Sequence, residues 1–508
     1  MTAKAPSVLQ PTVAEPSVDG RLERWSDRIS PIVIKEVRQM VRGREFNYSF
    51  TLSVLIGLLA SFVTVITWSG GVGSSGISVF SWLTTCLTIV GFVVAPLGAF
   101  SALRNERLER TLDLVTVTTM SARRIVIGKL LAQAVKLVTL FSALAPFIAM
   151  SFVLGGIDLP TIGGTLATLF LVSLWMCAAS LFLSCIAKSR AVSSLILGAM
   201  VVFFLFFGLG SGVGFLLRGF YYGSPFGPPV RSPFLIFSGG FDWWTVAGFG
   251  AFFAVTIVNL ILLAENRLLQ PAEDRSTALR IGFLAQLLML LGLAVYPAFK
   301  GGPYGTSETA DLLGTLGGFQ LAAVALFSIT EDLVPSRRIR HQIQSATGWR
   351  KYLWIFRPGA WRGAIYVLIQ MALLLATTLV FFSSSSTEFD WMLAICGYIC
   401  FFSALPVVVM QFLNRPFKPV HRRIAIILLL PVAALLPDFL VYLITGDFGG
   451  FYSARHVLDP FRTLFNWRSR LTSDWHFLAM GICAAGLILY LVVIGIGRQE
   501  SAVHETAD

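Results

Sequence analysis

Long runs of apolar residues, separated by short polar segments, recur along most of the chain. Each run approaches the roughly 20 residues that a helix needs to cross the hydrocarbon core of a membrane. Backbone groups in lipid must be satisfied internally and strand-like alternation is absent, so the runs predict helices and not a barrel. About twelve runs meet this length criterion: Phe50–Trp68, Phe80–Leu103, Leu130–Leu154, Ile162–Ala187, Val192–Leu217, Trp243–Leu263, Leu279–Phe299, Ala310–Ile329, Gly363–Phe382, Trp391–Leu413, Ile424–Thr445 and His476–Gly497.

The pattern predicts an all-α, polytopic integral membrane protein with about twelve transmembrane helices, arranged as two blocks of six. A polar patch that contains Pro271 separates the blocks. The first residues are rich in Pro, Ser and Ala and lack an apolar core, which is typical of a disordered tail and not of a signal peptide. The expected domains are therefore a disordered cytoplasmic tail at 1–27, a membrane domain with an interfacial helix and six spans at 28–275, and a second six-span membrane domain at 276–508.

Composition and charge agree with this class. Of the 508 residues, 56% are hydrophobic and 13% charged, whereas a soluble domain carries about 25% charged residues. The net charge of +12 gathers in the segments 1–45, 104–129, 331–362 and 414–423. The positive-inside rule places these segments, and with them both termini, in the cytoplasm. The arginine-containing loop 446–475 is the exception to this orientation. Membrane orientation thus explains the charge, and no nucleic-acid partner is expected.

The chain lacks the residue patterns of a catalytic, cofactor or metal site. No phosphate-binding loop is present, so we expect no ATPase activity from this chain itself. The five histidines are scattered, and none forms a zinc-binding pair at helical spacing. All six cysteines lie within the apolar runs. Cys396 and Cys400 are one helical turn apart, for which packing is a better interpretation than metal binding because no histidine or further cysteine is near in sequence.

Ionisable residues within the apolar runs are few. Asp438 follows Pro437 in the eleventh run. An acid inside the membrane is a functional candidate by default, although a simple role at a helix break is the alternative. Lys136 lies about two turns from Lys129, and we expect its ammonium group to reach the inner surface by snorkelling.

The stretch "ISPIVIKEVRQMVRGREF" before the first run predicts a separate helix. Ser30 is suited to cap it, and Pro31 to occupy its first position. Apolar residues share one face, whereas Lys35, Arg38 and Arg42 occupy much of the other. This pattern favours a helix that lies in the headgroup layer. A merely solvated basic helix is the alternative.

The stretch "RNERLERTLDLVTVTTMSARRIVIGKLL", first charged and then rich in threonine, separates the second run from the third. Residues of both signs, from Glu106 to Asp113, fall at helical spacing, and Leu112 lies on the apolar face. Ser121 is suited to cap the helix that enters the membrane next. The stretch therefore predicts a short helix, a turn and the start of a span. A solvated turn between two spans is the alternative.

These two stretches together resemble the permease subunits of the ABC-2 transporter family. Members of that family have an interfacial helix rich in Lys, Glu and Arg, an "E-x-x-x-T-L-x-L-L" segment, a Ser-containing turn and a Gly-Lys pair that enters the next span. The resemblance covers about residues 29–275, and this chain departs from it at Met120, where many members have proline. The matching interfacial residues are Lys35, Glu36 and Arg38, and the residues implied to contact an ATPase are Glu106, Glu109, Arg110, Thr111, Leu112, Asp113 and Ser121.

The resemblance implies a transmembrane permease subunit that works, most simply in export, with a separate ATP-binding subunit in a bacterial plasma membrane. Membrane lipid and a second copy of the chain are further expected partners. Two other functions stay open: a membrane enzyme that acts on lipid-linked substrates, for which the region Arg455–Arg470 with His456 and Asp459 is the candidate site, and a membrane anchor for an ATPase without transport.

Overall fold

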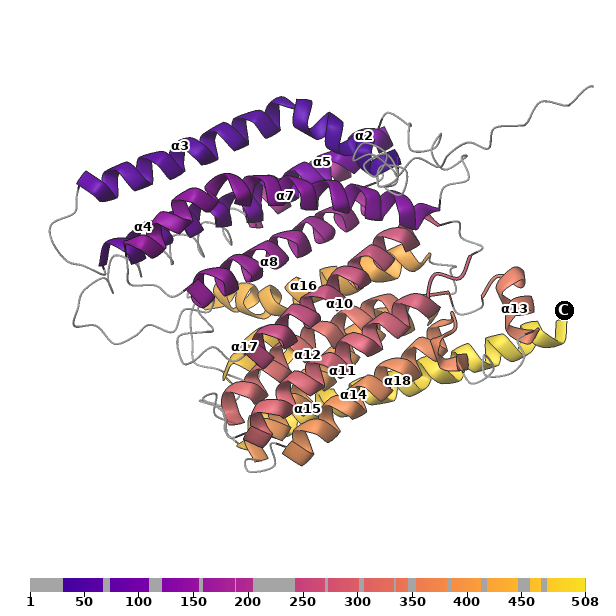
Figure 1. Ribbon diagram of the computed structural model, residues 1–508. Helices are drawn as coiled ribbons and strands as arrows, with labels where there is room; N and C mark the ends of the chain where they lie inside the picture. The colour runs from indigo at the N-terminus through magenta and orange to yellow at the C-terminus, as the bar shows by residue number, and fades with distance from the viewer. Residues whose placement is uncertain are drawn as a thin grey trace, which may run out of the picture. The chain divides into compact units, whose positions relative to one another are not determined.

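The computed structural model describes fourteen segments of the chain, and all regular structure in them is helical (Figure 1). The described residues are 31–66, 74–108, 121–154, 159–187, 189–203, 243–269, 273–300, 306–332, 335–345, 353–381, 386–412, 418–445, 457–466 and 473–507. The tail predicted at 1–27 lies outside them.

Ten helices in the described part of the chain are long and apolar enough to cross a membrane. Two shorter apolar helices, Arg190–Phe203 and Leu313–Ser328, lie on the fifth and eighth predicted runs. Each of the predicted runs thus coincides at least in part with a helix. The chain is all-helical where described and has the helices of a polytopic membrane protein, as the apolar runs predicted.

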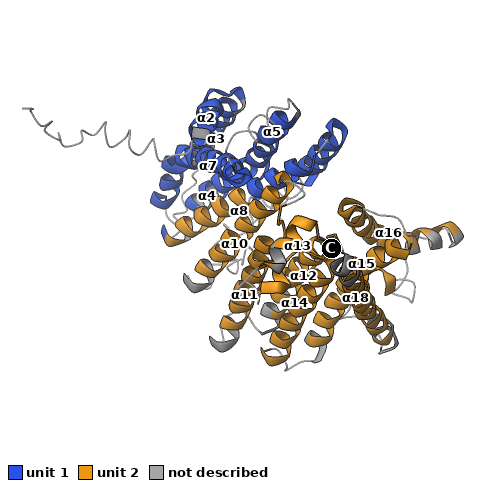
Figure 2. Cartoon of the chain, turned by 90° about the vertical axis from the view of Figure 1, so that its right-hand side faces the viewer, with its two compact units in different colours: residues 1–159, 176–228 blue, residues 160–175, 229–508 orange. Residues whose placement is uncertain are grey.

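The chain forms two compact units, coloured separately in Figure 2. Unit 1 comprises residues 1–159 and 176–228, and unit 2 comprises residues 160–175 and 229–508. Helix α8 (Leu159–Ile186) contributes to both. Within unit 1, α7 (Ala122–Val153) is the central helix because it packs against most of the others. Its neighbours are α2 (Pro31–Arg42), α3 (Arg44–Ile66), α4 (Ser74–Ile89) and α5 (Ala95–Leu108).

The second predicted run of unit 1 is interrupted by one turn of π-helix. This turn, η1 (Val90–Val94), joins α4 to α5, and the Ala95 N–H donates to the Val90 carbonyl. Pro96 follows directly and has no N–H to donate to a preceding carbonyl. The wider turn therefore forms where proline already weakens the α-helical hydrogen-bonding pattern, and such turns occur frequently at functional sites.

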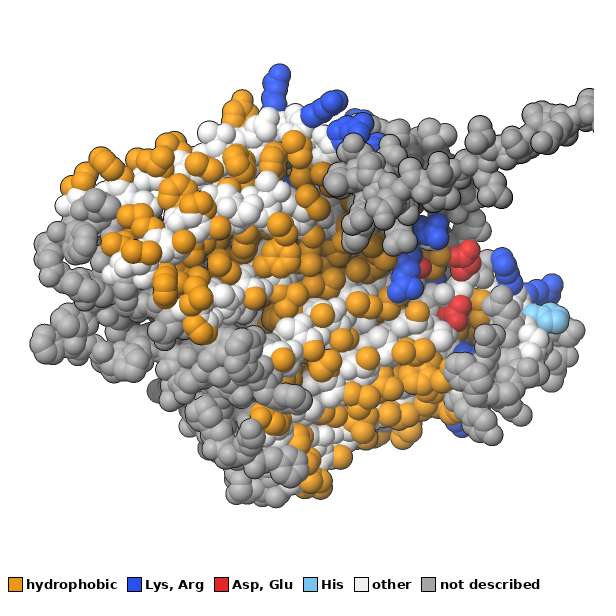
Figure 3. All heavy atoms as spheres, viewed as in Figure 1, with side chains coloured by type: hydrophobic (Ala, Val, Ile, Leu, Met, Phe, Trp, Pro, Cys, Tyr) orange, Lys and Arg blue, Asp and Glu red, His pale blue; other side chains and the backbone are white. Residues whose placement is uncertain are grey.

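The helix predicted before the first span is separate from that span, as the sequence predicted. Helix α2 begins at Pro31, and Gly43 separates it from α3. Val33 is buried, whereas Lys35 and Arg38 are exposed. Figure 3 shows hydrophobic side chains over the outer surface of α3 and Lys and Arg side chains at the α2 end. The exposed apolar residues of α3 include Leu52, Leu55, Leu58, Leu59 and Phe62.

Unit 2 is built around a close pair of helices, α15 and α18. Its helices are α10 (Trp243–Leu268), α11 (Thr277–Lys300), α12 (Thr306–Ser328), α13 (Arg337–Gln344), α14 (Ala360–Phe381), α15 (Ser386–Phe412), α16 (Pro419–Thr445), α17 (Pro460–Asn466) and α18 (Ser473–Ala507). A Cβ added at Gly486 of α18 would lie 2.7 Å from the Phe401 backbone nitrogen of α15, and one at Gly397 would lie 2.0 Å from Cys483 Sγ. Small residues thus let two membrane helices approach backbone to backbone.

Candidate functional site

A buried lysine joins three helices at the charged end of unit 1. Lys129 of α7 has only 3% of its side chain exposed, and its Nζ lies 2.9 Å from Glu36 Oε1 of α2 and 3.0 Å from Glu106 Oε1 of α5. The two glutamates keep 13% and 25% of their side chains exposed. Burying a charge is costly unless it is paired and hydrogen-bonded, and here two carboxylates pair with one ammonium group. We call Glu36, Glu106 and Lys129 the ion-pair cluster.

The ion-pair cluster holds α2 against the start of α7, where the third predicted span begins. Glu36 is separated from Lys129 by 93 residues, so α2 is held by a contact that is distant in sequence. Glu106 lies in the last turn of α5, and Lys129 lies in the third turn of α7. The chain between these two helices, residues 109–120, is therefore attached at both ends to helices that the cluster connects.

A second contact fixes the end of α5. The Arg107 guanidinium donates from Nη1 to the Cys185 carbonyl oxygen over 2.5 Å. Cys185 lies in the last turn of α8, where carbonyl groups have no partner within the helix, and a cation near a helix C-terminus also interacts favourably with the helix dipole. Neighbouring residues Glu106 and Arg107 thus attach α5 to two different helices.

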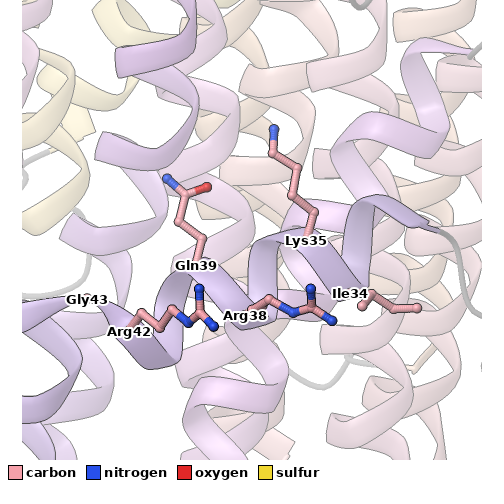
Figure 4. A pocket seen from close by; sticks show the side chains of 6 residues that line it. All are labelled: Ile34, Lys35, Arg38, Gln39, Arg42 and Gly43. Atoms are coloured by element: carbon pink, nitrogen blue, oxygen red, sulfur yellow. The ribbon is translucent and has the colours of Figure 1, made fainter.

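The exposed side of α2 is basic. Lys35, Arg38, Gln39 and Arg42, with Ile34 and Gly43, line an open pocket of about 560 Å³ along this helix (Figure 4). All four polar side chains are exposed. The arrangement can bind an acidic protein surface or anionic headgroups through charge complementarity. Lys35 and Arg38 thus lie on this surface, whereas Glu36 points to the ion-pair cluster.

The predicted ATPase-contact residues are only partly within the described structure. Glu106 belongs to the ion-pair cluster. Ser121 is the N-cap residue of α7, as predicted, and its carbonyl accepts the Arg124 N–H at 2.9 Å. Its side chain makes no capping hydrogen bond, so the expected side-chain cap is wrong in that detail. Glu109, Arg110, Thr111, Leu112 and Asp113 lie outside the described residues, and the coupling helix stays a prediction.

Lys136 does not snorkel to the surface, which corrects the expectation from sequence. Its side chain is buried, with 4% exposed. A Cβ added at Gly98 of α5 would lie 3.2 Å from Lys136 Nζ, so this glycine makes room for the lysine side chain. Lys129, Gln133 and Lys136 are all buried and spaced by four and three residues, which places them on one helical face. The spacing of these three polar residues in the sequence could have predicted a buried polar face on α7.

Unit 2 has a polar cluster of its own that sequence reasoning missed. Arg280 of α11 is 1% exposed, and its Nη2 lies 2.7 Å from Glu331 Oε2. Its Nη1 donates to the carbonyls of Ile355 at 2.9 Å and Arg357 at 2.7 Å. Glu331 also accepts the Gly359 N–H at 2.9 Å. The cluster therefore holds the segment before α14 against the start of α11.

Half-buried polar groups also make hydrogen bonds near this cluster, between the end of α10 and the start of α11. Arg275 donates from Nη2 to the Leu269 carbonyl, and Asn266 donates to the Arg275 carbonyl at 2.5 Å. Burial lowers the pKa of the Arg275 guanidinium, and the opposite charges of Glu273 and Asp332 partly counter this shift. Hydrogen bonds thus connect the residues on the two sides of the polar patch around Pro271, where the sequence predicts a boundary between the two blocks.

The remaining candidate residues form no chemical centre in the described part of the chain. Asp438 lies on α16, but its side chain is not among those described. Cys396 and Cys400 are buried free thiols, and both face the contact with α18 around Cys483. Within the described ranges, no three His, Cys, Asp or Glu residues are placed to hold a metal ion.

Comparison with known proteins adds no assignment. No protein-family model matches the chain, and neither the curated proteins nor the solved structures contain a match. The function must therefore be inferred from the residues and contacts of this chain.

Proposed function

We propose that this chain is the transmembrane permease subunit of an ATP-driven transporter that resembles the ABC-2 type, and that it acts in export with a separate ATP-binding subunit. The ion-pair cluster is the observation that supports this proposal most. The three segments that carry the family resemblance, namely the interfacial helix, the end of the second run and the Gly-Lys entry of the third, meet at Glu36, Glu106 and Lys129.

The ion-pair cluster suggests how a conformational change in an ATPase is transmitted to the membrane helices. The stretch 109–120 connects α5 to α7, and Lys129 ties both helices to α2. A force applied to this stretch therefore acts on three helices together. A partner can shift a conformational equilibrium only if it binds the two states with different affinity. In our proposal, nucleotide binding by the ATPase supplies that difference through contacts with Leu112 as the apolar anchor and with the charged residues Glu109, Arg110 and Asp113 beside it.

The finer topology belongs to the same proposal. We place about twelve spans in a bacterial plasma membrane, with both termini and the stretch 104–129 in the cytoplasm. The basic exposed side of α2, with Lys35, Arg38 and Arg42, then faces the cytoplasmic headgroup layer, where anionic lipids attract positive charge.

The membrane-enzyme alternative has less support. Its candidate acid, Asp459, is 6% exposed, and its Oδ1 accepts the backbone N–H groups of Phe461 at 3.0 Å and Arg462 at 3.2 Å. These bonds cap α17, which begins at Pro460, so this carboxylate has a structural role. An ATPase anchor without transport differs from our proposal only in lacking a substrate that stimulates ATP turnover.

The proposal is tested by the substitution Leu112→Asp. Loss of an apolar anchor residue from an interface typically weakens the binding free energy by about 2 kcal/mol or more, which lowers the affinity more than tenfold. We expect the variant to insert normally and to lose the co-purifying ATPase. Thr118→Asp, which adds the same charge beyond the proposed contact, is the control and should retain it. If Leu112→Asp binds the ATPase as tightly as the unmodified chain, this stretch is only a turn.

A further inference from the structure

Two guanidinium groups lie near one indole ring in unit 2, where the start of α14 meets α18. Arg362 Cζ lies 5.0 Å from the centroid of the Trp361 ring, and Arg498 Cζ lies 5.4 Å from it. Both distances fit a cation–π interaction. Two positive charges near one ring also repel each other, because Coulomb energy rises as charges approach. An anion bound between them would therefore be stabilised by both.

The close packing of the two helices fixes this geometry. A Cβ added at Gly497 would lie 2.6 Å from Trp361 Cβ, so the absence of a side chain at Gly497 lets α18 pass close to α14. Arg498 follows Gly497 directly and is exposed. Trp361 in turn stacks on Trp354, with ring centroids 5.9 Å apart and an interplanar angle of 29°. The ring on which the arginines converge is thus held from two sides.

The buried arginine of unit 2 makes the site rigid. Arg280 donates to the carbonyls of Ile355 and Arg357, between Trp354 and α14. Arg362 donates from Nη1 to the Pro358 carbonyl at 3.2 Å. The short segment from Trp354 to Pro358 is therefore held in place by Arg280, and the same segment orients the Arg362 side chain. Such preorganisation lowers the entropy cost of binding.

Exposed apolar residues continue from both arginines along the helices. On α18, Leu491 and Ile488 are 63% and 61% exposed; Leu491 lies seven residues before Arg498, on the same face, and Ile488 lies beside Leu491 in the preceding turn. On α14, Ile369 is 41% exposed and lies seven residues after Arg362. Each helix thus presents an apolar surface that ends at an arginine.

We propose that this site binds an anionic phospholipid. The phosphate of the headgroup is bound by Arg362 and Arg498, and the acyl chains lie along the exposed apolar residues of α14 and α18. Trp354, which is 41% exposed, lies at headgroup level, where tryptophan is enriched in membrane proteins. Basic residues near a membrane surface attract anionic lipid, and the two converging guanidinium groups make this attraction local to one site.

The test is lipid retention by the full chain, measured by native mass spectrometry after exchange into micelles that contain phosphatidylglycerol or phosphatidylcholine. We expect preferential retention of one phosphatidylglycerol. Arg362→Gln or Arg498→Gln should each weaken it about fivefold, and the double variant roughly 20-fold. An excess of inorganic phosphate should leave the lipid bound, because the acyl chains supply the rest of the affinity.

The matched control is the double variant Arg337→Gln/Arg338→Gln, which removes the same charge from the exposed side of α13 and should leave retention unchanged. Arg498 is exposed, so its substitution should not affect folding, and an unchanged elution volume checks this. Equal retention of the two lipids, equal loss in the control, or displacement of the lipid by phosphate would each overturn the proposal.

Discussion

Substitution of Lys129 by methionine should destabilise unit 1, because it leaves two carboxylates without their shared cation. At about 3 Å and an effective dielectric constant of about 20, each ion pair corresponds to about 5 kcal/mol of attraction, much of which is offset by desolvation. Loss of one partner from a buried pair typically costs about 3–5 kcal/mol. Glu36 and Glu106 keep 13% and 25% of their side chains exposed, so water partly compensates, and we expect a cost of about 3 kcal/mol.

The assay is unfolding of the full chain in mixed micelles, with the free energy of unfolding compared between variants. Lys35→Met is the matched control, since it removes the same charge from an exposed position of α2 and should cost under about 0.5 kcal/mol. A double-mutant cycle with Glu36→Gln should give a coupling energy of about 1–3 kcal/mol. If Lys129→Met is no more destabilising than Lys35→Met, the ion-pair cluster does not hold the three helices together.

The other predictions concern helix packing, orientation and ATP turnover. Gly486→Val should lower the free energy of unfolding by at least about 2 kcal/mol in the same assay, because the added side chain would meet the α15 backbone. The control is Gly495→Val, where a Cβ meets nothing within 4 Å and little change is expected. Equal effects of the two variants would contradict the close packing of α15 and α18. In a Cys-less chain, an impermeant reagent outside the cell should label Ser74→Cys and not Arg110→Cys; the reverse pattern would invert the topology. The purified chain alone should hydrolyse no ATP, and turnover that persists through azide and phosphatase controls would refute this.

The helices of this protein follow closely from its sequence, because lipid forces the backbone to satisfy its own hydrogen bonds. Each apolar run coincides at least in part with a described helix, and α2 begins at Pro31 as the fixed φ of proline predicts. The interruption at Val90–Val94 was not predicted. Pro96 was a signal that hydrogen bonding is weakened there, but proline alone does not specify a π turn.

The contacts of the candidate site were less predictable, since they join residues distant in sequence. Glu36 and Lys129 both lie in segments that carry the family resemblance, yet they are 93 residues apart, and no sequence pattern specifies that they pair. Lys136 was wrongly expected to snorkel because its position was read along the membrane axis and not around the helix. The burial of Arg280 depends on carbonyl groups of a segment about 75 residues away, which no local sequence pattern specifies.

The most direct measurement is the composition and activity of what co-purifies with the tagged full chain from its native membrane. We predict one ATP-binding protein with a phosphate-binding loop, in a fixed ratio to the chain, and ATP turnover by the complex that neither component shows at the same rate alone. Isolation of the chain without any such ATPase, under conditions that preserve other membrane complexes, would contradict a permease function.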